Sequence, residues 1–109
     1  MKLRRLLVLA AATALPACSG TSPDLAPGQV NVSDYLFSPR TASPDTNGVV
    51  TWYWVGFDDH NLVFADGIGS LTTPQSSGQH QRDFSSDPPG TYAYECTRHQ
   101  GMNGSVVVP

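Results

Sequence analysis

From Gln29 onward the sequence is built of short runs of β-branched and aromatic residues, and turn-forming clusters separate these runs. No stretch of this region places apolar residues at the i, i+3, i+4 spacing of an amphipathic helix. The strand-like runs are "QVNV", "VVTWYWV", "NLVF", "HQRDF", "TYAYEC" and "SVVV", and the turns between them include "PDTNG", "ADGIGS" and "SSDPPG". Short strands separated by turns in this way predict an all-β sandwich or barrel with a single small core.

The N-terminus has the features of an export signal. Three basic residues within the first five positions precede an apolar run from Leu6 to Leu15, which only Thr13 interrupts. This run is too short to span a bilayer as a helix and fits the apolar region of a signal peptide. We therefore predict a protein that is exported to the periplasm or the cell surface.

The residues that follow this run resemble a bacterial lipobox. In "LPAC", Leu15 stands three residues before Cys18, and the small residue Ala17 stands directly before it. The resemblance implies a lipoprotein-type signal peptide over residues 1–17 and a lipid on Cys18. It also implies a flexible tether over 18–28, where "SGTSPDLAPG" is small, polar and rich in Pro and Gly. The alternative is an ordinary signal peptide that is cleaved nearby.

Removal of the signal leaves a strongly acidic chain. The full sequence has six Lys+Arg and nine Asp+Glu, and three of the basic residues lie in the signal, so the mature part has three basic and nine acidic residues, or −6. Such a charge argues against nucleic acid as a partner and against electrostatic binding to anionic lipid. We expect contact with a membrane through the lipid anchor only, and protein partners with a basic face.

The two cysteines, Cys18 and Cys96, have different predicted fates. A disulfide between them is the simplest expectation for an exported protein. A lipid on Cys18 excludes that disulfide and leaves Cys96 as a single thiol in an oxidising compartment. A bound metal is the usual protection for such a thiol.

Cys96, His99 and Met102 fall within seven residues, on the connection before the last predicted strand. The chain offers two further histidines, His60 at the start of a predicted strand and His80 inside another. Two imidazoles, one thiolate and one thioether form the donor set of a type 1, or blue, copper site. His80 has no Cys or Met neighbour, and we assign it to the surface.

The segments "HNLVF" and "PGTYAYECTRHQGMNGSVVV" resemble the small blue-copper proteins of the plastocyanin and amicyanin type. This resemblance covers residues 29–109 and implies a Greek-key β-sandwich of about seven to eight strands, the cupredoxin-like fold. It implies one type 1 copper ion held by His60, Cys96, His99 and Met102. It also implies a hydrogen bond between Asn61 and Thr97, which follow the first histidine and the cysteine.

The resemblance implies an electron carrier, and not an enzyme, that cycles between Cu(I) and Cu(II). A monomer that docks transiently with redox protein donors and acceptors near His99 is expected. Asp58 and Asp59 are assigned to a solvated turn, and a docking role for them is left open. The alternatives are a copper-binding or copper-delivery lipoprotein, an enzyme with Cys96 as nucleophile, and a zinc site.

Overall fold

The computed structural model describes residues 25–109, so the predicted signal peptide, Cys18 and most of the tether lie outside the described residues. The described chain forms nine strands, slightly more than the seven to eight predicted, and none of its residues is helical. Within this range there is accordingly no apolar helix of a length that could cross a membrane. The strands are β1 (Gln29–Ser33), β2 (Leu36–Ser38), β3 (Thr41–Ala42), β4 (Val49–Trp54), β5 (His60–Phe64), β6 (Leu71–Gln75), β7 (Gln79–Asp83), β8 (Gly90–Glu95) and β9 (Asn103–Val108).

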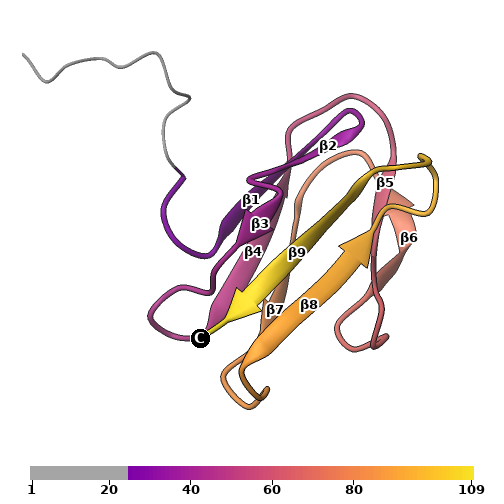
Figure 1. Ribbon diagram of the computed structural model, residues 1–109. Coiled ribbons are helices and arrows are strands. Elements are labelled where there is room, and N and C mark those ends of the chain that lie inside the picture. Colours follow the sequence, from indigo (N-terminus) through magenta and orange to yellow (C-terminus); the bar gives the residue numbers. More distant parts are fainter. Residues whose placement is uncertain (1–24) are drawn as a thin grey trace, which may run out of the picture.

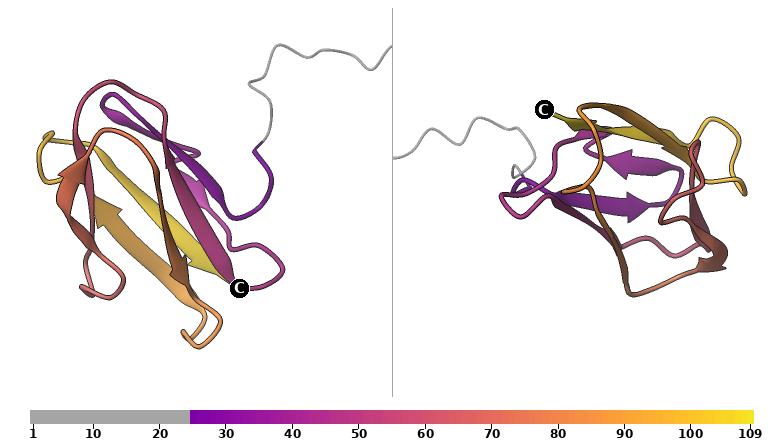
Figure 2. Two further views of the ribbon diagram at one scale, coloured as in Figure 1. Left: turned by 180° about the vertical axis from the view of Figure 1, so that it is seen from behind. Right: turned by 90° about the horizontal axis from the view of Figure 1, so that it is seen from below.

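The strands form two sheets that pack face to face, as Figure 1 and the view from below in Figure 2 show. One sheet has the order β2-β1-β4-β7 and the other has the order β3-β9-β8-β5-β6. The pairs β1–β4 and β3–β9 are parallel, and the remaining pairs are antiparallel. The prediction of an all-β sandwich is thereby confirmed.

Three strands were not predicted from the sequence, namely β2, β3 and β6. All three lie at an edge of their sheet. Two of them have only two or three residues, and β6 contains Pro74, a residue that sheets tolerate mainly at their edges. The predicted strands that correspond to the central positions of both sheets are all present.

The core lies between the sheets and is aromatic at its centre. Trp52 of β4 contacts Phe64 of β5 and Tyr94 of β8 edge to face, with ring centroids 5.6 and 5.4 Å apart. These contacts join one sheet to the other and bury all three side chains. Such aromatic pairs stabilise a core beyond the area that they bury.

A buried arginine closes the end of the sandwich where the β5–β6 and β7–β8 loops meet. The side chain of Arg82 is 2% exposed and forms ion pairs with Asp66 and Asp87 at 2.9 and 3.1 Å. Its guanidinium lies 4.4 Å from the ring centroids of both Phe64 and Phe84. The hydrogen bonds from Arg82 lower the pKa of Asp66, so this carboxylate is charged at neutral pH.

Candidate metal centre

The opposite end of the sandwich brings together side chains from distant parts of the chain. His60 is the first residue of β5, and Cys96 follows directly after the last residue of β8. His99 and Met102 lie on the loop between β8 and β9, which Figure 1 shows at the same end of the molecule as the start of β5. Two loops that are far apart in sequence therefore converge on one place.

Three of the predicted ligands lie within bonding reach of a common point. One donor atom from each of His60, Cys96 and His99 lies within 4.8 Å of the other two. The Cys96 Sγ and His60 Nδ1 atoms are 3.9 Å apart. His60 is 0% exposed and Cys96 is 3% exposed, whereas His99 is partly exposed. The cluster is thus buried on the side of the core and reaches solvent through His99.

The second nitrogen of each imidazole already has a protein partner. His60 Nε2 is 3.2 Å from a carboxylate oxygen of Asp34, and His99 Nε2 is 3.3 Å from the backbone oxygen of Asp59. The Nδ1 atoms remain as the nitrogens that can bind a metal. This arrangement is typical of metal-binding histidines, which donate their other N–H to an oxygen acceptor.

The separation of the Cys96 and His60 donor atoms fits a three-coordinate metal plane. With a metal–sulfur bond of about 2.3 Å and a metal–nitrogen bond of about 2.0 Å, two ligands 120° apart lie about 3.7 Å from each other. The observed separation of 3.9 Å between Cys96 Sγ and His60 Nδ1 is close to this value. The donor set of two imidazoles and a thiolate is that of a type 1 copper plane.

Met102 lies in the same loop, and its side chain is 3% exposed. Its backbone oxygen accepts a hydrogen bond of 2.9 Å from Cys96 N, and its backbone N–H donates to the oxygen of His99 at 3.1 Å. The short loop is therefore closed by two backbone bonds around the position of the cluster. The side chain of Met102 is buried on the same loop as Cys96 and His99, and a thioether is the weak fourth donor of type 1 sites.

Asn61 and Thr97 fasten the cysteine loop to the sheet. The Asn61 side chain donates to Thr97 Oγ1 at 2.7 Å and accepts from the Thr97 backbone N–H at 2.8 Å. Asn61 follows His60 and Thr97 follows Cys96 in the sequence. The pair of bonds fixes the distance between the two segments that carry these donors.

Asp34 and Tyr35, on the turn between β1 and β2, were not expected at this site. Asp34 contacts His60, and the Tyr35 ring packs edge to face against the His99 ring with centroids 4.7 Å apart. Hydrogen bonds from the backbone of Asp58, from His60 and from the backbone of Phe57 lower the pKa of Asp34. The sequence signal for both residues is only that of a turn, because nothing in "SDYL" indicates a partner more than twenty positions away.

The surface around His99 is mixed in character. Phe57 is 93% exposed and lies with Asp58, Asp59, Arg98 and His99 around a shallow hollow. An aromatic side chain so fully exposed beside two carboxylates is unusual for a solvated turn.

His80, by contrast, lies on β7, where its Nε2 is 2.7 Å from the backbone oxygen of Gly69, and it is absent from the cluster.

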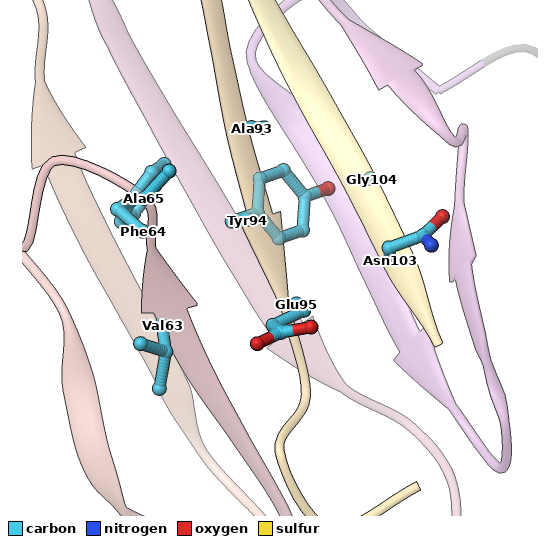
Figure 3. A pocket seen from close by; sticks show the side chains of 8 residues that line it. All are labelled: Val63, Phe64, Ala65, Ala93, Tyr94, Glu95, Asn103 and Gly104. Carbon is cyan, nitrogen blue, oxygen red and sulfur yellow. The ribbon is translucent and has the colours of Figure 1, made fainter. Parts of the chain in front are cut away.

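A second hollow lies on the five-stranded sheet, away from this end. Figure 3 shows Val63, Phe64 and Ala65 at the left, Ala93, Tyr94 and Glu95 in the middle, and Gly104 and Asn103 at the right. It contains no His or Cys, and we assign it no part in the metal centre.

No protein-family model matches the sequence, and the comparison with curated proteins gives no significant match. Solved structures do match the fold. Oxidised plastocyanin from Dryopteris crassirhizoma is 25% identical with a TM-score of 0.63, over 74% of this chain and 99% of that one. An amicyanin variant in its reduced state is 26% identical with a TM-score of 0.58, over 76% and 82% of the two chains.

A copper-containing nitrite reductase from Thermus scotoductus also matches, at 23% identity and a TM-score of 0.61. The match covers 88% of this chain and 25% of the enzyme, so it concerns one portion of a larger protein. The fold is therefore shared by small proteins of similar length and by a part of an enzyme.

Proposed function

We propose that this chain, a cupredoxin-like protein by its fold, is a single-electron carrier with one type 1 copper centre. The observation that carries the proposal is the convergence of His60, Cys96 and His99 within 4.8 Å, with Met102 buried in the same loop. His60 Nδ1, His99 Nδ1 and the Cys96 thiolate would hold the copper, and the Met102 thioether would be a fourth, weaker donor. Bound copper would supply the one-electron couple between Cu(I) and Cu(II).

The site is closed, which favours a carrier over an enzyme. Catalytic metal sites keep one position open for water or substrate, whereas here the chain itself offers four donors. The same burial argues against copper delivery, because Cys96 and Met102 are each only 3% exposed and offer no exposed sulfur for the transfer of copper to a partner. It also argues against a nucleophilic role for Cys96, whose sulfur has no access to a substrate.

The chain holds its donors in one arrangement. The Asn61–Thr97 bonds, the two backbone bonds within the loop and the packing of the core all hold the chain through groups other than the donor atoms. A site that is fixed in this way does not rearrange when the charge of its metal changes, and little reorganisation is needed for each electron.

Electrons would pass through His99, the one partly exposed member of the cluster. Partners would dock transiently around Phe57 and Tyr35, which are 93% and 63% exposed, through a small interface typical of redox encounters. Asp58 and Asp59 add negative charge at the rim, so a redox protein with a basic rim around an apolar contact is the partner that fits. The carrier would act as a monomer.

The test of this function is the visible spectrum of the purified protein with one equivalent of Cu(II). Thiolate-to-copper charge transfer should turn the protein intensely blue and should saturate at one copper per chain. Addition of ascorbate should remove the colour, and reoxidation should restore it. A colourless copper complex would exclude the type 1 assignment, and a preference for zinc over copper would favour a structural zinc site.

We further propose that the protein is exported and held at a membrane by a lipid on Cys18, on the strength of the "LPAC" motif. A diacylglycerol together with an N-acyl chain supplies more than one acyl anchor, which is sufficient for stable attachment. Wild-type protein expressed in a bacterial host should fractionate with membranes, and the Cys18→Ser variant should be soluble or retained as precursor. If wild type and variant both fractionate as soluble protein, the anchor does not exist.

A further inference from the structure

The carboxylate of Asp34 is the centre of a small network beside the predicted copper site. Its Oδ1 atom accepts hydrogen bonds from the backbone N–H groups of Phe57 and Asp58 at 3.0 and 2.9 Å. The same atom lies 3.2 Å from Nε2 of His60. One oxygen thus joins the β1–β2 turn to the β4–β5 loop and to the ring of a proposed ligand.

The backbone around Asp34 is built closely to hold this arrangement. A side chain at Gly56 would collide with the Asp34 carboxylate, so only glycine permits the approach. Tyr35, the next residue, has a φ of 67°, a left-handed conformation that is rare for a bulky side chain. Strain of this kind persists where the surrounding contacts require it, and it is concentrated at functional sites.

We propose that Asp34 is a positioning residue of the copper centre, one that orients His60 through a hydrogen bond and favours Cu(II) through its charge. This inference rests on the proposed function and assigns a role to a residue outside the four donors. It comprises two separable effects, one of the hydrogen bond and one of the charge.

The hydrogen bond fixes the tautomer of His60. The ring is 0% exposed, so its Nε2 needs a protein partner, and a carboxylate can only accept. The proton must therefore reside on Nε2, and the lone pair of Nδ1 is left pointing toward Cys96 Sγ, 3.9 Å away. The metal-free protein is thereby prepared for metal binding, without a change of tautomer.

The charge acts on the oxidation state. A negative group that accepts a hydrogen bond from the second nitrogen of a ligand imidazole increases the electron donation of that ring to the metal. It thereby stabilises the more highly charged ion, Cu(II). Asp34 is 30% exposed at its side chain, which leaves the interaction only partly screened. Loss of the charge should thus weaken Cu(II) binding more than Cu(I) binding.

Two substitutions separate these effects, and a third is the control. Asp34→Asn keeps an acceptor oxygen of the same shape and removes the charge, whereas Asp34→Ala removes both. Asp58→Asn removes one charge from the adjacent loop, where the side chain accepts a hydrogen bond from the Tyr35 hydroxyl at 3.2 Å. All three are to be compared in the full chain.

The first measurement uses metal-free protein and the ¹⁵N chemical shifts of the two ring nitrogens of His60. Wild type, Asp34→Asn and Asp58→Asn should show the proton on Nε2, and Asp34→Ala should show a mixture of tautomers. A pure Nε2–H tautomer in a folded Asp34→Ala protein would overturn the positioning role. Because no copper is present, this result is independent of the proposed function.

The second measurement is the ratio of Cu(II) to Cu(I) affinity, obtained from the midpoint potential of the copper-loaded protein. Outer hydrogen-bond partners commonly change metal affinity by about 10–100-fold, and we expect Asp34→Asn to reduce the ratio by about tenfold. For one electron, a tenfold change is a rise of about 59 mV in potential. A shift in Asp34→Asn no larger than that in Asp58→Asn would overturn the charge effect, even with the blue band intact.

Discussion

Replacement of Cys96 by alanine should abolish the blue colour of the copper-loaded protein completely. The colour arises from charge transfer between the thiolate and Cu(II), and Cys96 is the only thiol among the described residues. The substitution removes one sulfur from a buried position, so the sandwich should still fold without metal. Absorption spectra of the two proteins with one equivalent of Cu(II) provide the measurement.

The matched control for this loss is His80→Ala, which removes a histidine that the structure keeps away from the cluster. This variant should bind copper and keep its colour. A blue Cys96→Ala protein, or a colourless His80→Ala protein, would contradict the assignment of the site. Near-ultraviolet circular dichroism of the buried Trp52 would establish that each variant is folded.

Replacement of Arg82 by alanine should lower the free energy of unfolding of the metal-free protein by about 3 kcal/mol, at the lower end of the range for a broken buried ion pair. The lower end applies because Asp66 is 33% exposed at its side chain and is partly screened. The variant also loses the packing of the guanidinium against Phe64 and Phe84. Urea unfolding followed by tryptophan fluorescence measures the change.

Arg40→Ala is the control, because Arg40 is exposed and its guanidinium donates to the Asn103 side chain. This substitution should lower the free energy of unfolding by no more than about 0.5 kcal/mol. Copper-loaded Arg82→Ala should keep its colour, since Arg82 lies at the other end of the sandwich. A loss of stability no larger than that of Arg40→Ala would mean that the buried pair contributes nothing.

The same arginine gives the fold a dependence on pH. Arg82 holds the pKa of Asp66 below its ordinary value of about 4, so the ion pair stabilises the fold fully above that pH. The contribution is lost as the pH falls through the lowered pKa and Asp66 takes up a proton. Wild type should therefore lose more stability on acidification than Arg82→Ala does.

The central strands of the sandwich could be predicted from the sequence, whereas three of the four edge strands, β2, β3 and β6, could not. The central strand β4 pairs with β7 through five of its six residues and with β1 through four, and its run "VVTWYW" is β-branched and aromatic throughout. The edge strand β6 pairs on one side only, and its residues are mostly polar. A strand that pairs with only one neighbour needs few apolar or β-branched residues, and the residues of β6 therefore resemble those of a loop.

Some residues of the candidate site could likewise be predicted from the sequence, and others could not. The residues that the sequence indicated carry the chemistry themselves, or stand next to a residue that does, as Asn61 stands next to His60. The site residues that it did not indicate, Asp34 and Tyr35, act through partners that only the folded chain brings close. An aspartate and a tyrosine in a turn have no local signature that separates these roles from solvent exposure.

The parallel pairing of β3 with β9 joins two distant parts of the chain, and so does the metal centre. Residues 41 and 42 can form this edge strand only after residues 105 and 106 have been brought beside them. Contacts between such distant segments make a fold slow to assemble, because the long intervening loop must be ordered first. The cluster itself needs residue 60 beside residues 96 and 99, so a copper ion would meet a complete binding site only after the last strand has docked. Metal uptake would then follow folding, and a chain truncated before β9 would have the cysteine and both histidines without the frame that brings them together.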